Sequence, residues 1–247
     1  MKTREPKVLI FDVETKYVKA RIWRTGKQIV RHGQICKGEK FDIICVAYKW
    51  AHQKRVYCLD WGLHEQNSGP MIKKFGKIIE QADLVLGQNS DAFDIKQINT
   101  QRLIHGQTPI AWPLSEDLMK QVKRNFYVTS SSLDYMAKLL TGEGKSRMEE
   151  ADWVDVVESK SKSALIKMKH YCKRDVIKTQ AVWDKVRPYC KPKFDRRLLC
   201  GKDTCATCGS KNVAGHGQRV YLTKIVDRVR CNDCGSIRQF NSRLHSA

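Results

Sequence analysis

Two acidic side chains at the end of an apolar run have the spacing of a metal site. Asp12 and Glu14 stand two positions apart in VLIFDVE, and on a β-strand such positions point to the same side. Neighbouring carboxylates repel each other, so bringing them together is costly unless a cation lies between them. Hard divalent cations such as Mg²⁺ or Mn²⁺ prefer an all-oxygen environment. The pair therefore predicts a divalent-metal site on the first strand, of a kind that performs phosphoryl-transfer chemistry.

Three further residues extend this pattern along the chain. Asp94 lies in GQNSDAFD, and Tyr171 and Asp175 lie in HYCKRDV. On a helix, Tyr171 and Asp175 are four residues apart and therefore share one face. Asp94 and Tyr171 also have plainer interpretations when taken alone. Asp94 would suit the N-terminus of a helix because the helix dipole favours an acid there, and Tyr171 would serve as an ordinary half-buried aromatic.

The last four of the ten cysteines have the spacing of a structural metal site. Cys205, Cys208, Cys231 and Cys234 form two C-x2-C pairs separated by 22 residues. Each pair can place two thiolates on one tight turn, and a glycine follows each pair, where such a turn needs backbone freedom. Two turns complete a tetrahedron, which predicts structural Zn²⁺; redox chemistry would instead favour a single pair beside a βαβ unit. The other six cysteines are scattered, and those in apolar strand-like runs are expected to be buried.

The composition favours an intracellular protein with a polyanionic partner. Lys and Arg number 46 against 26 Asp and Glu, which gives a formal net charge of +20. Nucleic acid is the commonest polyanion that such a surface attracts, and a generally solvated basic surface is the alternative. No apolar run approaches the roughly 20 residues of a membrane span, and the start of the chain lacks the apolar core of a signal peptide. We therefore expect a cytoplasmic protein with reduced cysteines and no membrane partner.

The hydrophobic pattern predicts a mixed α/β unit followed by a small cysteine-bearing one. Apolar runs indicate strands at 7–14, 41–50, 54–61 and 84–87, with a fifth beginning at 112–114. Helical spacing marks 71–82, 93–104, 130–140 and 163–189, while 115–126 is helix or loop and 142–148 is a break. The first three strands are expected to form an antiparallel meander within a mixed sheet. Residues 190–204 lack periodicity and are interpreted as a linker, and 219–231 alternates as a strand pair would.

Three of these motifs, in this order, carry a family resemblance. FDVET, then GQNSDAFD with the family's G-x-N-x-x-x-F-D pattern, then Y-x3-D in YCKRDVIKT resemble the DEDDy-type 3′–5′ exonucleases of the ribonuclease H-like superfamily. The nearest match in style is the proofreading exonuclease domain of family-B DNA polymerases. The resemblance implies a ribonuclease H-like mixed sheet with flanking helices over residues 5–190, and the cysteine pairs add a small zinc ribbon over residues 203–240.

The resemblance also implies roles for the five residues. Asp12 would bridge two Mg²⁺ or Mn²⁺ ions, Glu14 and Asp175 would complete the first site, and Asp94 would help to hold the second ion. Tyr171 would orient the attacking water. His170 also stands where the histidine subtype of the superfamily places its general base, but the sequence around Tyr171 is closer to the tyrosine subtype.

The expected activity is hydrolysis of phosphodiester bonds from the 3′ end of nucleic acid, with DNA favoured over RNA. An exoribonuclease on the same scaffold, a catalytically inactive nucleic-acid-binding protein and a polymerase-associated subunit remain alternatives, and a replication or repair protein is a further partner to test. Basic residues in the C-terminal unit are expected to contact phosphates: Lys211, Arg219, Lys224, Arg228, Arg230 and Arg238.

Overall fold

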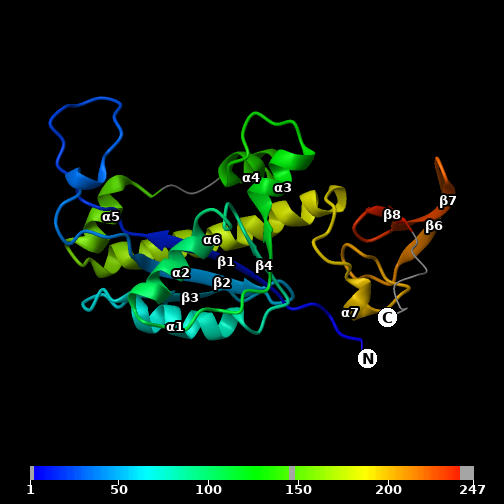
Figure 1. Cartoon of the computed structure of the whole chain (residues 1–247), viewed down its shortest axis with the longest axis horizontal. Helices are drawn as coiled ribbons and strands as arrows, with labels where there is room; N and C mark the ends of the chain where they lie inside the picture. The colour runs from blue at the N-terminus through cyan, green and yellow to red at the C-terminus, as the bar shows by residue number, and fades with distance from the viewer. Residues whose placement is uncertain (1–2, 145–147, 240–247) are drawn as a thin grey trace.

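The main body of the molecule is a five-stranded mixed sheet with helices on both faces (Figure 1). The computed structural model describes residues 3–144 and 148–239. The strands are β1 (Val8–Thr15), β2 (Ile43–Trp50), β3 (Tyr57–Asp60), β4 (Leu84–Gly87) and β5 (Leu114–Asp117), in the order β3-β2-β1-β4-β5. β1, β2 and β3 pair antiparallel, whereas β4 runs parallel to β1 and β5 runs parallel to β4. The predicted fold class and its antiparallel meander are therefore confirmed.

The helices follow most of the expected spacing. They are α1 (Ser68–Ile79), α2 (Asp94–Ile104), α3 (Leu118–Asn125), α4 (Leu133–Thr141), α5 (Glu150–Val157), α6 (Lys162–Val186) and α7 (Arg197–Cys200), with short 3-10 helices η1 (His32–Gln34) and η2 (Arg187–Tyr189). α5 was not predicted, because its eight residues are too short for a clear period. β5 extends to Asp117, so the first residues expected as helix or loop are strand. Of the predicted break at 142–148, residues 145–147 lie outside the described residues.

Alternate side chains of β1 face opposite layers of the body, as the pleat of a strand requires. One layer packs against α1 and α2 and contains Leu9, Phe11, Val13, Ile72, Phe75 and Ile98. The other packs against α3, α4, α5 and α6 and contains Val8, Ile10, Leu118, Met136, Val156 and Met168. Asp12 and Glu14 continue the alternation of Val8 and Ile10. The strand therefore directs both carboxylates toward the α6 side of the sheet.

A smaller antiparallel sheet forms the C-terminal unit, which we define as residues 203–239. It consists of β6 (Val213–Tyr221), β7 (Lys224–Cys231) and β8 (Ile237–Gln239) in that order. The predicted strand pair is present as the β6–β7 hairpin, and β6 begins six residues earlier than expected. Residue 240, the predicted end of this unit, lies outside the described residues.

The segment at 190–204, interpreted as a linker, is folded against the body. It contains α7, its Phe194 packs against the layer beneath α6, and Arg197 is buried in an ion pair with Asp195 at 2.5 Å. The amide of Arg4 donates to the carbonyl of Leu199 at 2.9 Å. The sequence did not predict this packing, because the contacts of Phe194 and Leu199 depend on distant residues rather than on local periodicity.

In the described parts of the chain, none of the helices combines the length and the apolar character that crossing a bilayer would require.

Candidate active site

The predicted acids of the body meet on the α6 side of the sheet. Asp12, Glu14 and the thiol of Cys172 each offer one ligand atom, and the three atoms lie within 4.8 Å of one another. Burial raises the pKa of Asp12 well above its ordinary value, and the charges of Glu14, Asp94 and Asp175 raise it further. The structure therefore brings all four carboxylates into electrostatic contact. Such a group resists ionisation on its own and could bind a metal ion, which would favour the ionised form.

Asp94 reaches this cluster because the loop before α2 turns sharply. Asn89 has a left-handed backbone with a φ of 59°, and the amides of Ala92 and Phe93 donate to its carbonyl. Asp94 then begins α2, and its Oδ1 accepts a hydrogen bond of 3.0 Å from the amide of Val13 on β1. Burial is the main reason that the pKa of Asp94 rises to about 7. The loop thus fixes the carboxylate of Asp94 against the strand that carries Asp12.

Another buried acid, which the sequence analysis missed, holds that loop in place. Asp117 ends β5, and its carboxylate accepts from the amides of Asn89 at 3.1 Å and Asp91 at 3.2 Å. It also accepts from the amide of Lys120 and so caps the N-terminus of α3. Asp91 lies in this turn and pairs with Lys120 at 2.7 Å. Asp117 is a positioning residue, and a helix-capping pattern was its only signal in the sequence.

Helix α6 contributes Tyr171 and Asp175 on its buried face. Both side chains are buried, whereas His170 points to solvent. The ring of Tyr171 packs edge-on against Trp153 of α5, with centroids 6.2 Å apart and an interplanar angle of 74°. The indole of Trp153 donates to the carbonyl of Thr15 at 3.2 Å. Trp153, which the sequence analysis also missed, thus connects α5 to the end of β1 beside Tyr171.

Cys172 is the third residue that the sequence analysis missed at this site. Its thiol lies 3.5 Å from Oδ2 of Asp12 and 3.4 Å from the Asp12 carbonyl. Burial raises the pKa of Cys172 well above its ordinary value, so the thiol keeps its proton and can donate it to Asp12. In the sequence, Cys172 is one of the scattered cysteines. Its partner Asp12 lies 160 positions away, so no local pattern indicates the contact.

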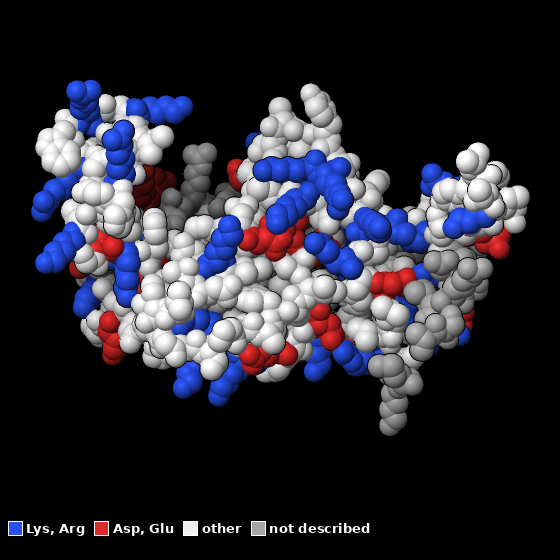
Figure 2. All heavy atoms as spheres, in the orientation of Figure 1, with Lys and Arg blue, Asp and Glu red and all other residues white. Residues whose placement is uncertain are grey.

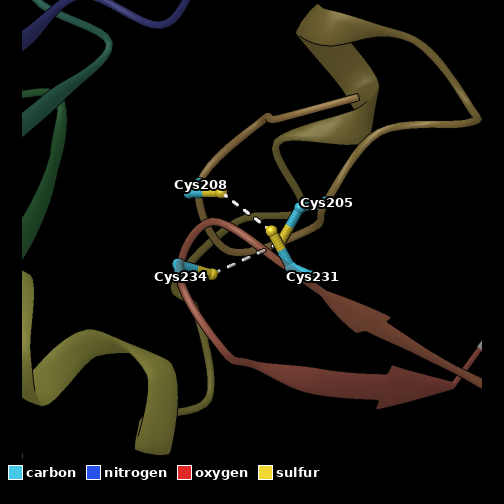
Figure 3. A group of neighbouring side chains, drawn as sticks. All are labelled: Cys205, Cys208, Cys231 and Cys234. Atoms are coloured by element: carbon cyan, nitrogen blue, oxygen red, sulfur yellow. Dashed lines mark hydrogen bonds between the residues drawn. The ribbon is translucent and has the colours of Figure 1, made fainter. Parts of the chain in front are cut away.

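The four C-terminal cysteines form a second group that could hold a metal ion (Figure 3). Their sulfur atoms all lie within 4.8 Å of one another, with Cys205 and Cys234 at 3.8 Å and Cys208 and Cys231 at 3.6 Å. Each pair ends in a turn whose glycine has a positive φ, 82° and 76° respectively. The amides of these glycines donate to the carbonyls of Cys205 and Cys231. The predicted convergence of the two C-x2-C turns is therefore present.

The basic residues of the C-terminal unit do not all face solvent. Nη2 of Arg238 donates to the carbonyls of Pro188 at 3.1 Å and Cys190 at 2.5 Å. Arg230 and Arg238 line a surface hollow of about 780 Å³, together with Arg187 and Tyr189. Arg238 therefore attaches the C-terminal unit to the end of α6, a contact that the sequence analysis did not foresee.

Comparisons with known proteins find a similar fold but do not assign the chain to a family. No protein-family model matches the chain, and no curated protein matches it. The fold is similar to that of the family B DNA polymerase from the hyperthermophilic archaeon Pyrobaculum calidifontis, with a TM-score of 0.55 and 14% sequence identity. The match covers 79% of this chain and 26% of the polymerase, so the chain spans about a quarter of that protein's length. At this identity the similarity concerns the fold alone.

Proposed function

We propose that this protein is a metal-dependent 3′–5′ exonuclease that hydrolyses phosphodiester bonds in nucleic acid, with DNA as the preferred substrate. The observation that carries the proposal is the convergence of Asp12, Glu14, Asp94 and Asp175 on one side of the sheet. Four carboxylates in one group, of which Asp94 and Asp175 are buried and Asp12 and Glu14 half-buried, fit hard divalent cations such as Mg²⁺ or Mn²⁺. The preference for DNA is supported by the resemblance of the motifs to the exonuclease domain of family-B DNA polymerases.

The residues take the following roles in this proposal. Asp12 would be shared by the two ions, Glu14 and Asp175 would complete the first position, and Asp94 would help to hold the second. When bound, two such ions supply a hydroxide and neutralise the charge on the phosphate. The phenol of Tyr171 holds the attacking water in line with the scissile bond. Packing against Trp153 limits the movement of the Tyr171 ring, which supports this orienting role.

The C-terminal unit is proposed to be a zinc ribbon, separate from a catalytic domain at 5–190 and spanning 203–240. A tetrahedron with Zn–S bonds of about 2.3 Å places its sulfur atoms about 3.8 Å apart. The distances of 3.8 and 3.6 Å between paired sulfur atoms are close to this value. We assign the ribbon a role in holding nucleic acid through its exposed basic residues, among them Lys211, Arg219 and Lys224.

Removal of the bridging carboxylate tests the nuclease assignment. We expect Asp12→Ala to abolish Mg²⁺-dependent shortening of 5′-labelled single-stranded DNA while binding is retained, because the variant removes a metal ligand and few phosphate contacts. Asp184→Ala is the matched control, since Asp184 is an exposed acid on the same helix as Asp175. An Asp12→Ala protein that degrades DNA at the wild-type rate would overturn the assignment. Parallel reactions on RNA determine which sugar is preferred.

The orienting role of Tyr171 is tested by removing its hydroxyl alone. Tyr171→Phe keeps the ring against Trp153, and we expect turnover to fall by about 10²–10⁴-fold, the range for losing one proton-transfer or orienting group. DNA binding should barely change. His170→Ala is the paired control and should be mild, because His170 is exposed. A silent Tyr171→Phe beside an inactive His170→Ala would instead assign the chemistry to the imidazole.

A further inference from the structure

The segment between β1 and β2 stands away from the body as a basic arm, which we define as residues 18–38. Figure 1 shows it as a blue loop above α5, and in Figure 2 Lys and Arg side chains surround the same lobe at the upper left. The arm contains six cationic residues and neither Asp nor Glu. These cations are Lys19, Arg21, Arg24, Lys27, Arg31 and Lys37. Such a one-signed surface attracts a polyanion and would repel a basic partner.

Large apolar side chains alternate with these cations and are exposed. Trp23, between Ile22 and Arg24, exposes 78% of its surface, and Ile29 exposes 90%. An indole held in water costs free energy unless a partner covers it. Exposed aromatic rings among cations are the arrangement by which proteins bind single-stranded nucleic acid, because bases stack on the rings while the cations contact phosphates. A purely solvated basic loop would not need Trp23.

The root of the arm is fixed to the structure around the acid cluster. The amide of Lys16 donates to the carbonyl of Asp42 at 2.9 Å and so extends the pairing of β1 with β2. Tyr17 and Lys19 both bind the carboxylate of Glu158, the residue that caps the C-terminus of α5. The ammonium of Lys19 lies 3.0 Å from this carboxylate. These contacts hold the arm at the end of the strand that carries Asp12.

The stem of the arm is also ordered. The amide of Arg21 donates to the carbonyl of Gln34 at 2.7 Å, and the amide of Cys36 donates to the carbonyl of Lys19 at 2.9 Å. These bonds flank the isolated bridge between Ala20 and Ile35. A paired stem with an exposed tip presents Trp23 on a supported loop, which lowers the entropy that binding must overcome.

An apolar hollow lies between the root of the arm and α5. It has a volume of about 500 Å³ and is lined on the arm side by Thr15, Lys16, Tyr17 and Phe41 and on the α5 side by Glu150, Trp153 and Val154. Trp153 is the same side chain that packs against Tyr171. Through Trp153 the hollow is therefore one side chain away from Tyr171, which places the root of the arm near the acid cluster.

We propose that the basic arm binds single-stranded nucleic acid immediately upstream of the 3′ end that the acid cluster receives. Trp23 stacks on a base, and Arg21, Arg24 and Lys27 contact the phosphates on either side of it. This inference rests on the proposed nuclease function for the identity of the bound end. The binding itself depends only on the charge and exposure of the arm.

Salt-dependent binding tests the cationic half of the proposal. The triple variant Arg21→Ala, Arg24→Ala, Lys27→Ala is compared with wild type by fluorescence anisotropy on a labelled oligothymidylate, without divalent metal so that nothing is cleaved. Each lost phosphate contact lowers the slope of log K against log[salt] by about 0.7 for single strands, so we expect a decrease of about 2. The matched control removes three exposed lysines of α1, on the opposite side of the sheet: Lys73, Lys74 and Lys77.

Trp23→Ala tests the stacking half. Loss of one stacked base should weaken binding about 5- to 150-fold with little change in the salt slope. Wild-type affinity in both arm variants, or an equal loss in the α1 control, would overturn the proposal. Unchanged nucleic-acid binding would also leave a protein partner as the occupant of the arm. Because the substituted side chains are exposed, circular dichroism should show wild-type folding for both variants.

A small substrate separates failure of the arm from failure of the nuclease assignment. Thymidine 5′-(4-nitrophenyl phosphate) can occupy the acid cluster but is too short to reach the arm. We expect arm variants to cleave it at the wild-type rate, whereas Asp12→Ala does not. Weaker oligonucleotide binding in the arm variants, with no hydrolysis by wild type, would overturn the proposed function and leave arm binding intact. Hydrolysis by wild type, with unaltered oligonucleotide binding in both arm variants, would support the proposed function and overturn the proposal for the arm.

Discussion

The body and the C-terminal unit are held together by different means. The body buries two apolar layers, one on each face of its sheet. Among residues 203–239, the buried hydrophobic side chains are those of Cys205, Ala206 and Cys231, whereas Val220, Leu222 and Ile225 are exposed. A unit of fewer than about 40 residues rarely stabilises itself by burial alone. The C-terminal unit therefore depends on its cysteine group in the way that the body depends on its core.

The two candidate metal sites consequently differ in whether the fold holds the ligands together or depends on the metal to do so. In the body, the packed sheet and α6 hold four carboxylates together, and burial, followed by the charges of the other three acids, raises the pKa of Asp12. In the C-terminal unit, polar contacts join the two C-x2-C turns, among them those of Asp233 with Ser210 and Asn212. Little apolar surface is buried there, and a metal at the four thiols would supply the missing free energy. Loss of metal should thus inactivate the body without unfolding it, and unfold the C-terminal unit without unfolding the body.

The largest effect that tests this difference is loss of one thiol ligand. We expect Cys231→Ser to release Zn²⁺ and to unfold residues 203–239, because the apparent binding free energy of structural zinc is about 10–16 kcal/mol. Zinc content by mass spectrometry and limited proteolysis measure the two outcomes, while the thermal transition of the body should persist. Cys36→Ser is the control, since Cys36 lies outside the group. Retention of zinc and protease resistance by Cys231→Ser would contradict the comparison.

A core substitution should produce the reverse pattern. Phe75 is fully buried in α1, with ring centroids 5.7 Å from Phe11 and 5.6 Å from Tyr48. Phe75→Ala should lower the free energy of unfolding of the body by about 3–5 kcal/mol, measured by urea denaturation, with one zinc still bound per chain. Leu222→Ala is the control, because Leu222 is fully exposed in the turn between β6 and β7. Loss of zinc from Phe75→Ala would show that the two units fold together.

The sequence predicted those parts of the sites that are encoded locally. Asp12 and Glu14 are two residues apart on one strand, and the thiols lie in two C-x2-C turns. The geometry of a strand and of a tight turn was therefore enough to predict that these side chains lie close together. Asp94 and Asp175 were found through motif resemblance, and the structure brings both to Asp12.

The residues that support the acid cluster could not be predicted in this way. Asp117 acts through backbone amides of another loop, and Trp153 acts through contacts with Thr15 and Tyr171. Cys172 meets Asp12 only when α6 crosses β1. None of these contacts has a periodic or fixed-spacing signal in the chain. The same reason explains why residues 190–204 were interpreted as a linker although they pack against the body.

The smallest effect concerns Arg238, which joins the two units. Arg238→Gln removes the charged donor to the carbonyls of Pro188 and Cys190, and a hydrogen bond from a charged group contributes about 1.5–3 kcal/mol. We therefore expect protease cleavage within 190–204 to increase about 10- to 150-fold if cleavage follows local opening. Zinc content and the urea midpoint of the body should not change, because neither the thiols nor the core is altered.

Arg219→Ala provides the control for this variant, because Arg219 is an exposed cation that lies over the ring of Tyr221. It should leave cleavage unchanged and lower only the salt slope of nucleic-acid binding. Unchanged cleavage in Arg238→Gln would mean that Phe194 and the contact between Arg4 and Leu199 suffice to hold the segment. If the salt slope also fell in that variant, Arg238 would regain the phosphate-contacting role that the sequence predicted, and the two units would be joined by packing rather than by this side chain.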